Sequence, residues 1–174
     1  MSGPVSTPLL RLPAPVGSLA DNAGMRLDAT EARRRAADAD HGVLATLRAG
    51  QGPDVVPACF VLDGELVAIP VETVKDKAST DLQRARNLAA DARATLLVEH
   101  WDRDDWTRLW WVRLRLERSA EDEATTDRLG AALRKRYPQY REAPFAAVLT
   151  FRVREVTGWA AAAGPSAPGS AMRR

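Results

Sequence analysis

The sequence contains few of the residues that form disulfides and metal sites. Among its 174 residues there are one cysteine, Cys59, and two histidines, His41 and His100. A single cysteine cannot form an intrachain disulfide, which is typical of proteins in a reducing cytoplasm. These three residues lie far apart in the sequence and do not have the spacing of zinc ligands. We therefore expect a cytoplasmic protein with no metal site.

Several kinds of segment are also missing. No apolar run approaches the roughly 20 residues that span a bilayer, and the N-terminus lacks the basic start and apolar block of a signal peptide. The sequence has no GxGxxG motif, no Walker loop and no GxSxG elbow, so it indicates neither a Rossmann or P-loop phosphate site nor a serine hydrolase. The formal net charge of +2 gives no reason to expect nucleic-acid binding. If the protein is an enzyme, a bound cofactor would carry its chemistry.

The composition is typical of one soluble domain with flexible ends. Hydrophobic residues make up 45% and charged residues 28% of the chain, which is ordinary for a globular protein. Residues 1–24 hold four of the eleven prolines and predict a disordered extension, either a flexible leader or sequence upstream of a start at Met25. Residues 160–174 are rich in Ala, Gly, Pro and Ser and predict a disordered tail. The expected domain is residues 25–159.

The residue pattern predicts six β-strands, over residues 43–48, 55–62, 65–71, 94–100, 109–117 and 147–154, and the second of them is apolar on both faces. Asp63-Gly64 predicts a hairpin turn between the second and third of them. Capping-box spacing at Asp28–Glu31 and Thr80–Gln83 indicates the starts of two helices, and a third is expected over residues 121–136. Six strands with hairpin-like links argue against a parallel βαβ sheet. The sequence therefore predicts a mainly β (α+β) fold, a small antiparallel barrel with peripheral helices.

Four segments of the sequence, taken in order, carry a family resemblance. They are residues 41–47; residues 55–64; Lys75-Asp76-Lys77 with Leu82, Arg84, Asn87-Leu88 and Arg93; and Asp105-Trp106 and Leu109-Trp110-Trp111-Val112-Arg113 with Tyr137-Pro138-Gln139-Tyr140. Together they resemble the pyridoxamine 5′-phosphate oxidase-like family. The fourth segment is similar to an actinobacterial branch of that family, which depends on the deazaflavin coenzyme F420. The resemblance covers roughly residues 25–159.

The resemblance implies an FMN-binding type of split β-barrel that forms a homodimer, with two cofactor sites at the interface. It implies that the second and third strands line the cofactor ring, that basic residues after the third strand hold its phosphate, and that the partner chain closes the site. The candidate cofactor-binding residues are Val55, Val56, Pro57, Ala58, Pro70, Val71, Lys75, Lys77, Arg84, Trp110 and Trp159. Two departures affect this picture: Gly52-Pro53-Asp54 stands where relatives carry Arg-Pro, and a glycine is missing around residues 116–119.

The function implied is an F420-dependent oxidoreductase that transfers a hydride between the deazaflavin and a small unsaturated substrate. The alternatives are an FMN-dependent enzyme on the same fold, a non-catalytic dimer that binds a cofactor or haem, with His41 or His100 as haem ligand, and a structural dimer with an empty cleft. No residue is nominated as a catalytic acid.

Each candidate residue also has a simpler interpretation. The two lysines fit a solvated loop as well as a phosphate clamp. The paired tryptophans at 110 and 111 fit core packing as well as a dimer interface, and Trp159 fits a terminal anchor. Arg113 and Arg115 fit either a solvated strand face or a groove for the polyglutamate tail of F420.

Overall fold

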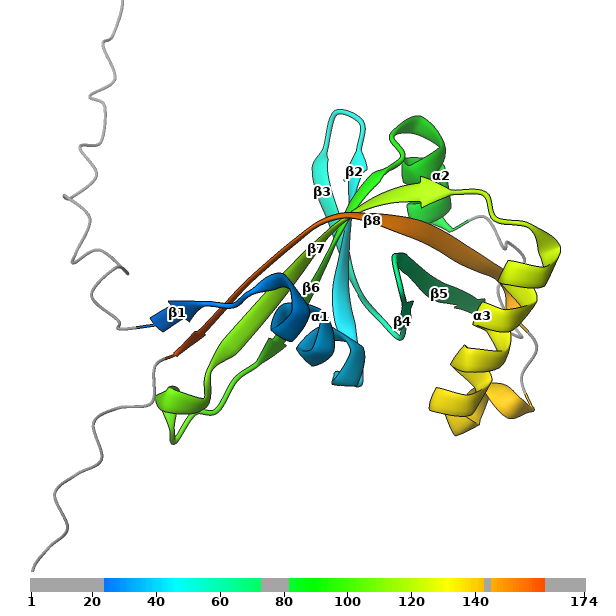
Figure 1. Ribbon diagram of the computed structural model, residues 1–174. Coiled ribbons are helices and arrows are strands. Elements are labelled where there is room, and N and C mark those ends of the chain that lie inside the picture. Colours follow the sequence, from blue (N-terminus) through cyan, green and yellow to red (C-terminus); the bar gives the residue numbers. More distant parts are fainter. Residues whose placement is uncertain (1–23, 73–81, 143–144, 162–174) are drawn as a thin grey trace, which may run out of the picture.

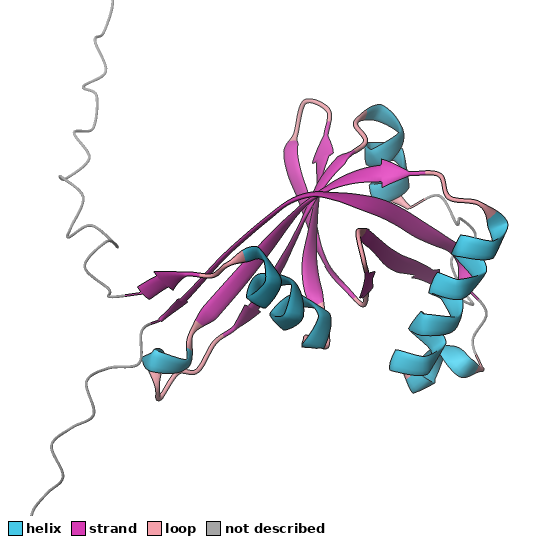
Figure 2. Cartoon of the chain, in the orientation of Figure 1, coloured by secondary structure: helices cyan, strands magenta, loops and turns pink. Residues whose placement is uncertain are grey.

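The computed structural model describes residues 24–72, 82–142 and 145–161 (Figure 1). Its elements, in chain order, are β1 (Gly24–Arg26), α1 (Ala29–Asp38), β2 (Gly42–Arg48), β3 (Gly52–Ala58), β4 (Val61–Asp63), β5 (Leu66–Glu72), α2 (Gln83–Ala90), β6 (Arg93–His100), the 3₁₀ turn η2 (Trp106–Arg108), β7 (Trp110–Ser119), α3 (Glu123–Arg136), the 3₁₀ turn η3 (Pro138–Arg141) and β8 (Phe145–Ala161). The described strands form one eight-stranded sheet, and the helices lie around it (Figure 2).

The sheet is antiparallel and curves towards a barrel without closing. Its strand order is β3-β2-β6-β7-β8-β5-β4, with β1 added beside β8, and every pair is antiparallel. β3 and β4 stand at opposite ends of this order, yet only Cys59 and Phe60 separate them in the chain. Three Cα–Cα steps span at most about 11 Å, so the two ends of the sheet must come close together. The result is a barrel with one open seam, as predicted from the sequence.

Strand β7 shows why these residues form a half-buried sheet. Val112, Leu114 and Leu116 are buried on one face, whereas Arg113 and Arg115 point to the other. Side chains alternate between the two faces of a strand, so the apolar half of the pattern fills the barrel. The predicted alternation is confirmed.

Strand β8 joins the two halves of the sheet and is longer than the predicted strand over residues 147–154. It has 17 residues, and it pairs with β5 along its first part and with β7 along most of its length. The register with β7 shifts between Arg115, which pairs with Glu155, and Leu116, which pairs with Val153, so Arg154 is the extra residue of a bulge in β8. A bulge bends the strand that carries it. Gly24 pairs with Ala161 and Met25 with Ala160, so residues at the inner edges of the predicted extension and tail belong to the sheet. The predicted disordered ends otherwise fall outside the described residues.

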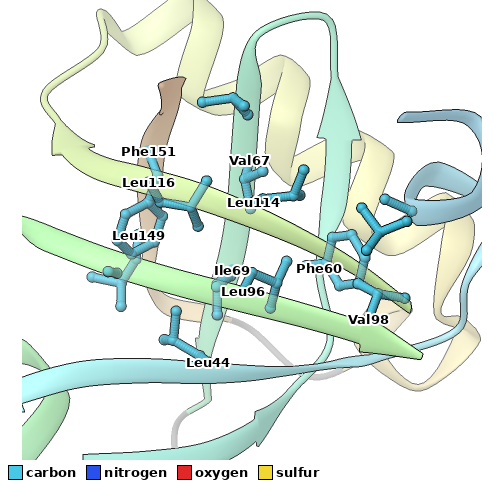
Figure 3. Packing of buried hydrophobic residues seen from close by; sticks show 14 of the residues in the cluster. Leu44, Phe60, Val67, Ile69, Leu96, Val98, Leu114, Leu116, Leu149 and Phe151 are labelled. Atoms are coloured by element: carbon cyan, nitrogen blue, oxygen red, sulfur yellow. The ribbon is translucent and has the colours of Figure 1, made fainter. Parts of the chain in front are cut away.

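The main core lies inside the curved sheet (Figure 3). It contains fully buried side chains from five strands and the β3–β4 corner, among them Leu44, Phe60, Val67, Leu96, Leu114 and Phe151, and it also includes residues of α1 and α2. A smaller cluster packs Leu129 and Leu133 of α3 against Val61 and Ala68. Helix α3 is therefore fixed to the short β4–β5 hairpin.

Two local predictions were wrong and one was confirmed. The strand predicted over residues 55–62 is broken at Cys59–Phe60 into β3 and β4, because the chain turns there to cross the seam. Helix α2 begins at Gln83 with Leu82 as N-cap and no side-chain cap. Gln83 is therefore the first helical residue and not the third, as the predicted capping box requires, and Thr80 lies outside the described residues. The Asp28 side chain does cap α1, accepting a hydrogen bond from the Glu31 amide at 2.8 Å.

Candidate functional site

A cleft of about 410 Å³ lies at the seam of the barrel. Its walls are the end of β3, the middle of β5, the start of α2, the turn η3 and two residues from loops. The lining residues are His41, Val56, Pro57, Ala58, Cys59, Ile69, Pro70, Leu82, Arg84 and Tyr140. Its volume falls within the range of about 300–1,000 Å³ that is usual for small-molecule and cofactor sites. Most of the lining is apolar, with a few polar groups, which is the ordinary character of such sites.

The cleft exists because β4 is short. β4 pairs with β5 only from Leu66 to Ala68, so the part of β5 that follows, with Ile69 and Pro70, has no strand partner on that side. Across the seam, β3 pairs only with β2 among the described strands. An edge strand presents unpaired backbone N–H and C=O groups, and those groups here border an apolar slot. This arrangement can accept hydrogen bonds from, and donate them to, a flat ring.

Arg84 places a positive charge at the cleft. It is the second residue of α2, and its Nε atom is buried without a hydrogen-bond partner in the described residues. A buried donor that lacks an acceptor costs free energy, and guanidinium groups form their strongest hydrogen bonds with carboxylates and phosphates. An anionic ligand group beside Arg84 would remove that cost.

A buried polar cluster fixes α2, and with it Arg84, to the sheet. The Asn87 amide donates to Oγ1 of Thr46 at 2.9 Å and to Oδ2 of Asp54 at 3.0 Å. It also accepts a hydrogen bond from Nε2 of Gln83 at 2.8 Å. Asp54 belongs to the Gly-Pro-Asp segment that departs from the family pattern, so in this chain that departure supplies an anchor for α2.

Burial and charge also act on Tyr137, whose hydroxyl lies beside the cleft. Desolvation is the main cause that raises the pKa of this hydroxyl above its ordinary value. The hydroxyl therefore stays protonated and able to donate a hydrogen bond at neutral pH.

The structure brings together five of the eleven candidate residues predicted from the sequence, and these are Val56, Pro57, Ala58, Pro70 and Arg84. Val55 does not line the cleft, because it points to the outer face and is 53% exposed. Val71 is buried in the core. Lys75 and Lys77 lie outside the described residues.

The two tryptophans lie elsewhere in the chain. Trp110 stacks on His100 with ring centroids 6.2 Å apart. The guanidinium of Arg35 makes a cation–π contact with the Trp110 ring, 5.5 Å from its centroid. It lines a second hollow of about 450 Å³ between α1 and η2. The ring of Trp159 packs so closely against Gly24 that a Cβ there would lie 2.1 Å from it. Neither tryptophan lines the cleft of its own chain.

Several cleft residues were not among the predicted site residues. They are His41, Cys59, Ile69, Leu82 and Tyr140. Tyr140 belongs to the Tyr-Pro-Gln-Tyr segment that carried the resemblance, so that motif could have nominated it. The sequence named His41 only as a haem ligand in one alternative and gave Cys59 no role at the site.

An open antiparallel barrel with a cleft at its seam defines a class, the split β-barrels. Residues 29–160 match the family model described as pyridoxamine 5′-phosphate oxidase. Because this match covers most of the chain, the protein belongs to that family, as the resemblance predicted. A comparison with curated protein sequences finds no match.

Solved structures share the fold at low sequence identity. A FAD-binding protein from Mesorhizobium loti is 19% identical with a TM-score of 0.59, and the match covers 80% of this chain and 98% of that one. Rv2991 from Mycobacterium tuberculosis is 19% identical with a TM-score of 0.61, over 83% and 94% of the two chains. A heme-binding protein from Mycobacterium smegmatis is 24% identical with a TM-score of 0.57, over 78% of this chain and 54% of that one. These likenesses support the fold alone.

Two further findings concern the described residues. None of their helices combines the length and the apolar character needed to cross a membrane. Within the same residues, His, Cys, Asp and Glu side chains form no group of three or more that could hold a metal ion.

Proposed function

We propose that this protein is a flavin-type oxidoreductase that binds its cofactor in the seam cleft, with F420 as the cofactor. The observation that carries the proposal is Arg84, a cation with a buried, unpartnered N–H group on a cleft that is otherwise mostly apolar. Flavin-type cofactors combine a flat ring with a phosphate, and the cleft offers a matching slot and a matching charge.

The phosphate is proposed to lie beside the first turn of α2. Leu82 caps this helix without a side-chain hydrogen bond, and the first intrahelical bonds come from the amides of Ala85 and Arg86 to the carbonyl of Leu82. The amides at the start of a helix are free to bind an anion, and the helix dipole favours negative charge there. We propose that Lys75 and Lys77, which precede this turn in the sequence, complete the clamp.

The ring is proposed to lie along the free edge of β3. Val56 and Ala58 present apolar surface at the cleft, while the backbone edge supplies donors and acceptors for the polar rim of the ring. A bound deazaflavin would supply the hydride chemistry. The chain's own contribution would be to hold the ring, orient one of its faces and exclude water.

We also propose that the outer face of the sheet forms a homodimer. Val43, Ala45 and Leu97 of this face are half-buried, and Leu47 and Val55 are exposed. Arg113 and Thr157 lie opposite each other on the same face, and each has a buried polar side-chain atom without a partner in the described residues. A docked partner could satisfy these groups and would bring its own Trp159, which lies on the same face as Arg113, towards the cleft.

The test is a fluorescence titration of purified protein with F420, and with FMN in parallel. We expect saturable F420 binding that weakens by about tenfold in Arg84→Gln, as for the loss of one charge-assisted hydrogen bond. The matched control is Arg86→Gln, which removes the same charge from the exposed side of the same helix and should leave the Kd within about twofold. Binding of FMN alone would overturn F420, and equal Kd values for the two variants would overturn the anion site.

A haem-binding function is the second candidate, because His41 lines the cleft and a neutral imidazole is a common axial ligand for haem iron. Titration with hemin would then give a Soret band that shifts in His41→Ala. A spectrum unchanged by this substitution would remove His41 as the ligand.

A further inference from the structure

The end of helix α3 holds two loops that border the cleft. Arg136, the last residue of α3, donates from Nη1 to the carbonyl of Ala37 at 2.6 Å and from Nη2 to the carbonyl of Ala39 at 2.5 Å. These carbonyls belong to the end of α1 and the link that leads to His41. A guanidinium fork fixes both carbonyls at once, so this wall of the cleft is tied directly to α3.

Tyr137, the next residue, holds the corner between β3 and β4. Its hydroxyl lies 2.7 Å from the carbonyl oxygen of Phe60 and 2.9 Å from that of Asp40, and it accepts a hydrogen bond from the Phe60 amide at 3.1 Å. Phe60 lies between the ends of β3 and β4, so neither strand ladder satisfies its backbone. One phenol hydroxyl therefore serves the backbone groups that the seam leaves unpaired.

The corner held by Tyr137 is also a wall between two hollows. A hollow of about 460 Å³, lined by Asp40, Cys59 and residues 136–140, shares Cys59 and Tyr140 with the cleft. The ring of Tyr140 is in edge contact with Tyr137, at 5.8 Å between centroids, and with Phe145, at 5.1 Å. The position of this wall thus depends on contacts that begin at Tyr137.

We propose that Tyr137 is a positioning residue for the cleft, acting through Cys59 and Tyr140 without lining the cleft itself. Its hydroxyl sets the corner where β3 ends, and so sets the width of the slot next to Ala58. The same arrangement gives the Tyr-Pro-Gln-Tyr segment a physical role: the first tyrosine holds the corner and the second forms the wall. The expected effect on ligand affinity rests on the proposed function, whereas the effect on the corner does not.

The experiment compares Tyr137→Phe with a control that removes a buried hydroxyl elsewhere. Thr150→Val is suitable, because the Thr150 hydroxyl is buried, donates to the Ser119 carbonyl at 2.7 Å and does not border the cleft. Cys59 is the only cysteine in the sequence, so its reaction rate with a thiol reagent such as DTNB reports on the corner alone. The Kd for F420, FMN, FAD and hemin is measured in parallel.

Cys59 is half-buried in the wild type. We expect it to react about tenfold faster in Tyr137→Phe, because local opening exposes the thiol further, and within about twofold of wild type in Thr150→Val. The Kd of whichever cofactor binds the wild type should rise severalfold in Tyr137→Phe alone. Equal thiol rates in wild type and Tyr137→Phe would overturn the proposal, as would a faster rate with an unchanged Kd.

Two other outcomes are also decisive. If the wild type binds none of the four cofactors, the proposed function fails, and the thiol rate still decides whether Tyr137 holds the corner. If Tyr137→Phe does not fold, Arg136→Lys takes its place, since lysine keeps the charge but cannot form the fork. Its Cys59 rate and Kd are expected to change in the same directions, and an unchanged pair of values would reject the positioning role of this helix end.

Discussion

Replacing Asn87 with alanine should destabilise the protein more than its small loss of volume suggests. Asn87 is 3% exposed and Thr46 is 2% exposed. The substitution removes the two hydrogen bonds that join α2 to β2 and β3, and a third, from Gln83, within α2. Each buried polar group left without a partner costs about 1–3 kcal/mol. Gln83 and Asp54 can reach water, so Thr46 bears most of the penalty. Together with the missing volume, we expect a loss of about 2–4 kcal/mol.

Asn87→Asp keeps the shape and gives a sharper test of the same cluster. In the wild type, Nδ2 of Asn87 lies 3.0 Å from Oδ2 of Asp54. The substitution replaces that amide with a carboxyl, so two carboxyls come close together. Two close carboxylates cannot both ionise easily, so the pKa of the new carboxyl is raised in the folded state above its unfolded value of about 4. The protonated form is therefore favoured on folding. The deficit relative to wild type should be small below about pH 4 and should grow as pH rises through the folded pKa.

The measurement is urea unfolding of wild type and both variants at a series of pH values, followed by tryptophan fluorescence. Asn87→Ala should show a deficit that changes little with pH, and Asn87→Asp one that increases with pH. A loss below about 1 kcal/mol in Asn87→Ala would show that the cluster does not anchor α2. Parallel pH profiles for the two variants would refute the argument that the carboxyls of residues 54 and 87 face each other.

Three other predictions follow from the fold. Leu114→Ala should cost about 2–5 kcal/mol in urea unfolding, because the side chain is fully buried between Leu96 and Val156 on the neighbouring strands; a loss below about 1 kcal/mol would contradict that packing. Arg34 and Arg35 lower the pKa of Glu31 to about 2, so this group contributes stability above its unfolded pKa that is lost as pH falls towards 2. The melting temperature of the wild type should therefore fall more steeply than that of Glu31→Gln as the pH is lowered from 5 to 2. Identical slopes would count against the ion pairs. Val55→Lys tests the proposed homodimer: it should leave monomer stability within about 0.5 kcal/mol but reduce the fraction of dimer in sedimentation, and an unchanged fraction would exclude this face as the interface.

The sequence was most informative where one residue pattern serves one structural purpose. Alternation along β7 and the cap at Asp28 are local features, and both were predicted correctly. The break at Cys59–Phe60 was missed because residues 55–62 are apolar on both faces, so periodicity gives no reason to stop a strand there. The break is imposed by topology, which requires the chain to pass from one end of the strand order to the other.

The candidate site was predictable only in part, for the same reason. The sequence does not show whether Val55 or Val56 faces the interior. The register decides it, because Val56 pairs with the buried Leu44 and therefore points to the same face. Leu82 and Tyr140 reach the cleft from elements far from β3 in the sequence. No pattern in a single sequence shows that these elements meet.

The seam links the fold to the proposed chemistry more directly than any single residue does. A closed barrel would satisfy every strand edge with a neighbouring strand, but here β4 stops pairing at Ala68 and leaves the following part of β5 facing the free edge of β3. Backbone groups along such an edge need other partners. At the corner, the hydroxyl of Tyr137 serves the backbone of Phe60. Along the rest of the slot, a flat ring with polar groups at its rim could complete hydrogen bonds that a closing strand would have made. Arg84, at the end of the same slot, would then fix the direction in which that ring and its phosphate enter.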